Sequence, residues 1–209
     1  MDLNHEFTVS VPVDEAWRIL TDVERIAPCL PGAELQEVEG DTYRGVVKVK
    51  VGPIQAQFKG QASFVERDDA AHRAVLKGEG RDTGGKGNAS ALITASMAPV
   101  SASETKVNVA TDLTITGKVA QFGRGAMADI SDKLLGQFVE NLNALIASQP
   151  ATVSAPADTA PAGQSEGVRK IDAPEAKPID LLDAAGAPIL KRALPVVAVI
   201  AVVVWLFLR

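Results

Sequence analysis

Hydrophobic and polar residues alternate along most of the first two thirds of the chain. Over residues 3–11 the odd positions hold Leu, His, Phe, Val and Val, whereas the even positions hold Asn, Glu, Thr and Ser. This period of two is typical of a half-buried strand. It recurs over 43–51 and 55–66, which Gly52 and Pro53 separate as a hairpin turn. Further strands are predicted over residues 71–82, 88–97 and 105–115.

Two segments have helical spacing instead. Pro12 and Asp14 are start signals, apolar residues then recur every three or four positions, and Pro28 ends the first helix. A longer helix is predicted from about residue 120 to 147, with its charged residues largely off the apolar stripe. The stripe consists of Phe122, Met127, Ile130, Leu134, Phe138, Leu142 and Leu145.

These elements predict an α+β domain, in which the long helix covers the apolar face of a curved antiparallel sheet. Many inward positions of the predicted strands are small, namely Gly45, Ala56, Gly60, Ala62, Ala74, Gly78 and Gly80. Two interpretations stay open. The small residues can leave an internal apolar pocket for a small molecule, or they can mark strand bends with helix side chains filling the space.

Composition divides the chain into three zones. Residues 1–147 hold seven of the nine aromatic residues and can build a core. Residues 148–190 hold six prolines, ten alanines and no aromatic residue, which predicts a flexible Pro/Ala-rich linker. Residues 191–209 hold sixteen consecutive uncharged residues, ALPVVAVIAVVVWLFL, between Lys191-Arg192 and Arg209.

The uncharged stretch predicts a C-terminal membrane anchor. As a helix it measures about 24 Å, somewhat less than the roughly 30 Å hydrocarbon core, so local thinning or a partly inserted position is needed. Burial as a helix of the globular domain, or in a partner protein, is the alternative, and the lack of a polar face disfavours the former. Lys191 and Arg192 then mark the cytoplasmic side, so we expect a tail-anchored protein at the cytoplasmic face of the cell membrane.

Charge and residue counts exclude several other classes. The net charge of -5 and the pI near 5.1 give no general basic field for nucleic acid. One cysteine and two histidines are too few for a Cys/His metal cage, and the N-terminus has no secretory signal pattern. Residues 80–87 have the glycine and lysine spacing of a P-loop, but Gly87 replaces the required Ser or Thr and a strand follows. No residue cluster predicts catalysis, so we expect no enzyme activity and no catalytic residues.

Five short motifs together resemble the family of the carbon monoxide dehydrogenase G subunit. They are TDVERIAPCLPGA at 21–33, VGPI at 51–54, GGKGNA at 84–89, GKVAQFGRG at 117–125 and APILKR at 187–192. The resemblance implies the helix-grip fold of the START-like (SRPBCC) superfamily, in which a seven-stranded curved sheet grips a long C-terminal helix around an apolar cavity. It makes the pocket the favoured one of the two interpretations above.

The resemblance also implies a function. Such proteins are accessory to a CO dehydrogenase-type molybdenum hydroxylase. A lipid-sized cavity, a membrane tail and an oxidising soluble partner enzyme together suggest that the ligand is a respiratory quinone, menaquinone or ubiquinone, carried between bilayer and enzyme. No covalent cofactor or metal is expected. The alternatives are a pure tether without ligand, and an enzyme or a lipid-transfer protein that uses the same fold on another hydrophobic substrate. The residues expected to line the cavity are Tyr43, Phe58, Phe64, Leu76, Phe122, Met127, Leu134 and Phe138.

Overall fold

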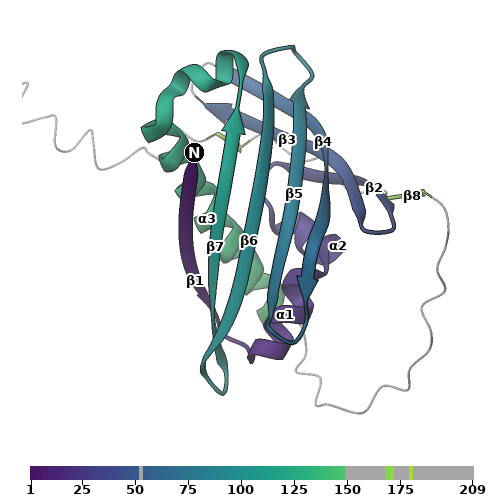
Figure 1. The fold of residues 1–209 in the computed structure, drawn as a ribbon, viewed down its shortest axis with the longest axis vertical. Helices are drawn as coiled ribbons and strands as arrows, with labels where there is room; N and C mark the ends of the chain where they lie inside the picture. Colours follow the sequence, from purple (N-terminus) through teal and green to yellow (C-terminus); the bar gives the residue numbers. More distant parts are fainter. Residues whose placement is uncertain (52–53, 149–167, 172–178, 181–209) are drawn as a thin grey trace, which may run out of the picture.

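A computed structural model describes residues 1–51, 54–148, 168–171 and 179–180. Seven long strands form one antiparallel sheet in the order β1-β7-β6-β5-β4-β3-β2 (Figure 1). Each strand from β2 to β6 pairs with the next one in sequence, while β1 closes on β7. The strands are β1 (Asp2–Val9), β2 (Ala33–Glu39), β3 (Thr42–Val51), β4 (Ile54–Asp68), β5 (Arg73–Asp82), β6 (Asn88–Ser101) and β7 (Glu104–Ile115).

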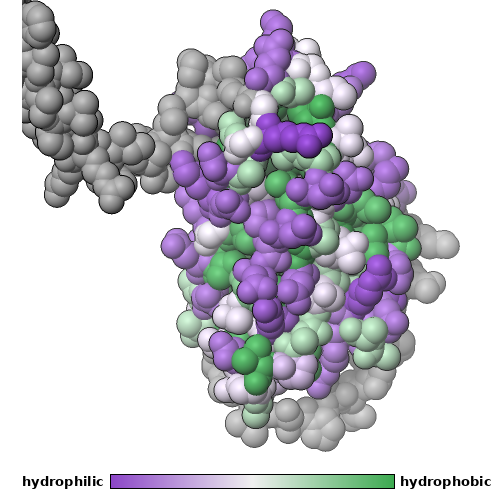
Figure 2. Space-filling view, turned by 60° about the vertical axis from the view of Figure 1, so that its left-hand side comes forward, coloured by the Kyte–Doolittle hydropathy of each residue, from purple (hydrophilic) through white to green (hydrophobic). Residues whose placement is uncertain are grey.

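One long helix, α3 (Gly123–Ala147), runs across the inner face of the sheet, and a short 3-10 helix, η2 (Gly117–Phe122), precedes it (Figure 1). The buried residues of α3 are Met127, Phe138 and Leu142. Figure 2 shows the side of the molecule with β1 forward, where mostly hydrophilic residues surround smaller hydrophobic patches. The sheet therefore buries one face under α3, as the alternation predicts.

The first predicted helix is divided into three short pieces. They are α1 (Val13–Thr21), α2 (Val23–Ile26) and the 3-10 helix η1 (Ala27–Cys29). The break falls at Asp22, whose carboxylate accepts a hydrogen bond from the Arg25 backbone N–H at 3.2 Å and caps α2. Asn141 of α3 donates from Nδ2 to the Cys29 carbonyl at 3.1 Å, so η1 is held against the long helix.

The hydrophobic core lies at one end of the layer between α3 and the sheet. It joins α1 and the C-terminal half of α3 to three strand ends, namely the end of β1 at Val9, the second half of β6 at Met97 and the start of β7 at Val107. Leu142 is fully buried there, and the rings of Phe7 and Phe138 meet edge to face with centroids 6.1 Å apart. Large side chains fill this end of the layer.

Two short strands lie within the range predicted as linker. Strand β8 (Arg169–Lys170) pairs antiparallel with β2, and β9 (Ile179–Asp180) pairs parallel with β3. The composition of 148–190 did not predict them, because a two-residue strand bound to an existing edge needs no apolar core of its own. The predicted anchor at 193–208 lies outside the described residues, and within the described ranges no helix is long and apolar enough to cross a membrane.

Candidate ligand-binding cavity

An apolar cavity of about 450 Å³ occupies the other end of the layer between α3 and the sheet. The sheet contributes residues of β2 to β7, and Leu134 of α3 lies on the opposite wall. Val23 of α2, Ala27 of η1 and Leu30 border it as well, and Leu30 is 42% exposed. These short elements therefore lie where the cavity meets solvent.

Small residues lying side by side on neighbouring strands create the space. The ladder pairs Gly45 with Gly60, Gly60 with Gly80, and Gly80 with Ala89. A second row pairs Ala62 with Gly78 and Gly78 with Ala91. All of these residues line the cavity. An apolar volume remains because inward side chains are missing over four adjacent strands.

The glycines in these rows occupy their positions for different physical reasons. A Cβ on Gly60 would collide with the Glu79 carbonyl oxygen, and one on Gly45 would collide with the Glu34 carbonyl oxygen. These two glycines allow close approach of neighbouring strands. A Cβ on Gly78, in contrast, would meet no atom within 4 Å. Gly78 therefore faces open space, and a side chain at this position would extend into the cavity.

Tyr43 brings a polar group to the cavity wall. Burial raises the pKa of its hydroxyl, and the nearby carboxylates of Asp41, Glu24 and Asp22 raise it further. The hydroxyl therefore keeps its proton at neutral pH and can donate a hydrogen bond. Among the described residues it has no hydrogen-bond partner, and its ring packs edge to face on Phe64 with centroids 6.3 Å apart.

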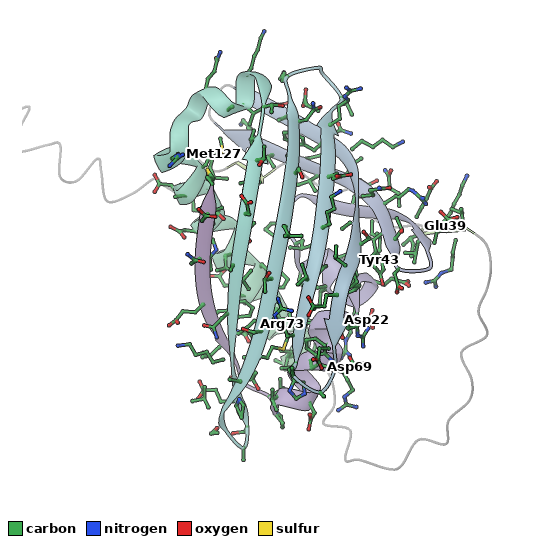
Figure 3. The ribbon with its side chains drawn as sticks, in the orientation of Figure 1. Asp22, Glu39, Tyr43, Asp69, Arg73 and Met127 are labelled. Atoms are coloured by element: carbon green, nitrogen blue, oxygen red, sulfur yellow. The ribbon has the colours of Figure 1, made fainter. Side chains whose placement is uncertain are left out.

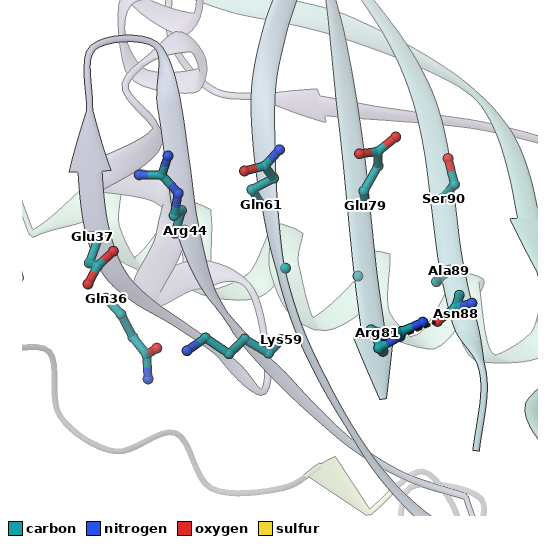
Figure 4. A pocket seen from close by; sticks show the side chains of 12 residues that line it. Gln36, Glu37, Arg44, Lys59, Gln61, Glu79, Arg81, Asn88, Ala89 and Ser90 are labelled. Carbon is teal, nitrogen blue, oxygen red and sulfur yellow. Dashed lines mark hydrogen bonds between the residues drawn. The ribbon is translucent and has the colours of Figure 1, made fainter. Parts of the chain in front are cut away.

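A second hollow, of about 630 Å³, lies on the outer face of the same sheet (Figure 4). Its side chains are polar, and the Arg81 Nε donates to the Asn88 Oδ1 at 3.3 Å. It shares Gly60, Gly80 and Ala89 with the apolar cavity, so the two hollows lie back to back across one layer of backbone. An apolar ligand fits the inner cavity, because the outer hollow would leave it against charged groups.

Three of the residues predicted to line the cavity do so, namely Tyr43, Phe58 and Leu134. Phe64 and Leu76 pack against the core instead, and Phe138 belongs to that core. Met127 is buried near the start of α3, well away from Tyr43 (Figure 3), and is not part of the cavity wall. The Phe122 side chain lies outside the described residues. Contact of any of them with a ligand stays a prediction.

Sequence reasoning missed the part of the wall that α2, η1 and β2 contribute. Ala33 and Leu35 of β2 line the cavity, yet β2 shows only a short alternation that a bulge between Leu35 and Glu37 interrupts. The turn signal Pro31-Gly32 directly before it is the one local sign of a strand.

The glycine-rich segment with P-loop spacing forms the turn between β5 and β6. Asp82, 3% exposed, accepts backbone N–H groups from Gln57 at 3.0 Å and Lys86 at 2.8 Å. Burial alone raises the pKa of this carboxyl, but the hydrogen bonds from the Lys86 and Gln57 backbone, with the charge of Lys86, outweigh it and hold the pKa below the usual value. The carboxylate thus takes up backbone donors that a phosphate would need.

The two histidines pair separately with acidic side chains. His5 Nε2 lies 3.1 Å from Asp132 Oδ1, and His72 Nε2 lies 3.0 Å from Asp14 Oδ1, as two separate surface pairs. Within the part of the chain that the structure describes, no three His, Cys, Asp or Glu side chains are placed to hold a metal ion.

Solved structures share this fold at low sequence identity. A conserved protein from Geobacillus kaustophilus superposes with a TM-score of 0.64 at 19% identity, over 70% of this chain and 95% of that one. Norcoclaurine synthase from Thalictrum flavum superposes with a TM-score of 0.51 at 12% identity, over 72% of this chain and 95% of the synthase chain. A protein from Thermus thermophilus superposes with a TM-score of 0.50 at 18% identity, over 71% of this chain and 100% of that one. These likenesses establish the fold alone.

The family assignment comes from the sequence. A search of curated proteins gives no match. The profile of the family described as the G subunit of carbon monoxide dehydrogenase (CoxG) matches residues 6–147, which include β2 to β7, the second half of β1, α3 and all residues that line the cavity. Four of the five motifs lie within the matched residues and the fifth, at 187–192, lies outside them. The match confirms the resemblance, and the chain belongs to the family of the carbon monoxide dehydrogenase G subunit, CoxG.

Proposed function

We propose that this protein is a membrane-anchored accessory protein that carries a respiratory quinone between the bilayer and a CO dehydrogenase-type molybdenum hydroxylase. The observation that carries the proposal is the apolar cavity between α3 and the glycine-rich part of the sheet. Its volume of about 450 Å³ falls within the roughly 300–1,000 Å³ usual for small-molecule sites. Among the described residues that line it, Glu34 and Glu79 are the charged ones, and Glu34 is paired with Lys48 at 3.6 Å, so the wall is mostly apolar.

The cavity wall suits a flat carbonyl-bearing headgroup with an apolar chain. Phe58 offers an aromatic face, and the protonated Tyr43 hydroxyl offers a hydrogen bond to a quinone carbonyl oxygen. Apolar residues of α2 and η1 border the opening. An isoprenoid chain that exceeds the cavity would leave past Leu30, whose side chain is partly exposed.

The C-terminal stretch supplies the route to the membrane in this proposal. Residues 193–208 carry no charge, and Lys191 and Arg192 before them are expected on the cytoplasmic side. The protein would take the oxidised quinone from the bilayer, present it to the enzyme and return the quinol. It acts as a carrier and not as a catalyst, and the family name supports the choice of partner enzyme.

Membrane-coupled oxidation tests the proposal. Membranes containing the partner enzyme would be assayed for substrate-dependent reduction of the quinone pool with the full-length protein and with a variant that lacks residues 193–209. The full-length protein should support reduction, and the truncated one should leave the membrane fraction and support much less. Equal reduction by both proteins, or a truncated protein that still pellets after high-salt washing, would contradict anchored quinone transfer.

A further inference from the structure

The sheet has one open edge beside the cavity. Strand β2 is the last long strand in the order, so its outer backbone groups have no long partner strand. Such an edge is a ready template for an added strand, because unpaired N–H and C=O groups lie in a row. We define the described residues 168–171 and 179–180 as the C-terminal arm. Figure 1 shows β8 of this arm beside β2.

The arm pairs with β2 in a defined register. Lys170 is opposite Glu37 and Arg169 is opposite Val38 in an antiparallel ladder. The Ile171 backbone N–H donates to the Gln36 carbonyl at 2.8 Å. Gln36 has no partner on β3, because the pairing shifts between Leu35 and Glu37. The bulge therefore gives the arm a distinct acceptor.

A second contact joins the arm to the mouth of the cavity. The Arg169 guanidinium forms an ion pair with the Glu24 carboxylate on α2. Val23, the neighbour of Glu24, lines the cavity, as does Leu35 of β2. The arm thus bridges two elements of the cavity wall.

Strand β9 extends the same edge. Pairing between β2 and β3 ends where Ala33 is opposite Val47, and β9 pairs with the following residues Val49 and Lys50. The arm therefore occupies the edge on both sides of the point where β2 begins.

We propose that the edge formed by β2 and the end of β3 is a docking site for the chain's own C-terminal arm, and that docking sets the reach between the domain and the apolar C-terminal stretch. Between α3 and Ala193, residues 149–192 can span at most about 160 Å when fully extended. With the arm docked through Asp180, residues 181–192 can span at most about 43 Å. The effect of docking on the distance between the domain and the membrane rests on the membrane anchor of the proposed function.

The contact is suited to reversible docking. The ladder is short, and the side chains of Arg169 and Glu24 are 62% and 35% exposed, so solvent and salt screen their attraction. A docked arm keeps the domain close to the membrane, where quinone is taken up. A released arm frees the edge and lengthens the reach toward the partner enzyme.

Disulfide trapping in the full-length protein tests the docking register. Cysteines replace Glu37 and Lys170, which are directly opposite, and a control pair replaces Glu34 and Lys170, about three residues out of register. The first pair should oxidise at least ten times faster than the control. E24R should slow its oxidation, and E24R with R169E should restore it. Equal rates for the two pairs, or no oxidation of the first, would overturn the docking site.

Energy transfer from Trp17 to a dansyl-labelled lipid in vesicles tests the reach. A W205F background leaves Trp17 as the one tryptophan donor. The oxidised E37C/K170C protein, whose arm is fixed on β2, should transfer more energy to the lipid than the E24R protein, whose arm lacks the ion pair with Arg169 and docks less often. Equal energy transfer in these two proteins would overturn the proposal that docking sets the reach between the domain and the apolar stretch. Failure of every variant to bind vesicles would instead overturn the membrane anchor of the proposed function, while the trapping result would still decide on the docking site.

Discussion

The two ends of the layer between α3 and the sheet have opposite contents. At one end Phe138 and Leu142 of α3 face Phe7, Met97 and Val107, and the space is filled. At the other end Leu134 faces rows of glycine and alanine, and about 450 Å³ stays open. Both ends belong to the same strands and the same helix.

The comparison shows that side-chain size at inward strand positions decides between core and cavity. Strand β5 has buried Ala74 and half-buried Leu76 toward the filled end but Gly78 and Gly80 toward the open end. The filled end supplies most of the stability, because burial of apolar area is the dominant favourable contribution. The open end gives up such burial and keeps an apolar cavity.

The largest expected effect is on the filled end. Phe138→Ala should lower the free energy of unfolding by about 3–5 kcal/mol, because it leaves a hole in packed surroundings. Leu134→Ala should cost no more than about 2 kcal/mol, since this side chain already borders open space. Urea unfolding of the full-length variants measures both. Equal losses would show that the two ends do not differ in packing.

The turn beside the open end depends on a buried carboxylate. Asp82→Asn should cost about 1.5–3 kcal/mol at pH 7, a fall in Tm of roughly 3–12 °C, because backbone donors of Gln57 and Lys86 lose a charged acceptor.

The effect of Asp82→Asn should depend on pH. The pKa of Asp82 is lowered in the folded state, so its contribution is fully present above the ordinary carboxyl pKa and is lost as the pH falls through the lowered value. The difference between wild type and variant should therefore shrink below about pH 4. A difference that grows on acidification would contradict the assignment.

Two glycines of the open end should respond in opposite directions. Gly60→Ala should cost about 1–3 kcal/mol, because its Cβ collides with the Glu79 carbonyl oxygen and the backbone must shift. Gly78→Ala should stabilise by about 0.5–1 kcal/mol, because its Cβ enters open space and Ala loses less chain entropy than Gly. Thermal unfolding separates the two, and destabilisation by Gly78→Ala would argue against an open cavity there.

The smallest expected effect concerns the hydroxyl in the open end. Tyr43→Phe should weaken quinone binding about 2–10-fold, the value of one hydrogen bond, and should leave Tm nearly unchanged. Titration of the purified protein with a short-chain quinone gives the affinity. Unchanged affinity would remove Tyr43 from the proposed headgroup contact.

Strand alternation and helix periodicity predicted six of the seven long strands and the covering helix, because both patterns record which face is buried. They could not predict β2, whose pattern a bulge interrupts, or β8 and β9, which depend on an edge built elsewhere in the chain. Asp22 likewise broke the first helix through a cap that the apolar spacing does not reveal.

The site was predicted less completely than the fold. Alternation assigned Phe58, Phe64 and Leu76 to one face, but it does not tell how far along the layer each residue lies. Distance along the strand separates Phe58 at the cavity from Phe64 and Leu76 at the core. The small residues Gly60, Ala62 and Gly78 were the better signal, since missing side chains mark where the layer stays open.

The ligand content of the purified full-length protein tests the central claim most directly. Organic extraction and mass spectrometry would compare wild type with Gly78→Leu, which fills the cavity, and with Gly136→Leu, which adds the same side chain on the exposed side of α3. We predict quinone in wild type and Gly136→Leu but little or none in Gly78→Leu. Absence of quinone from wild type, or equal amounts in all three proteins, would contradict a quinone-binding cavity.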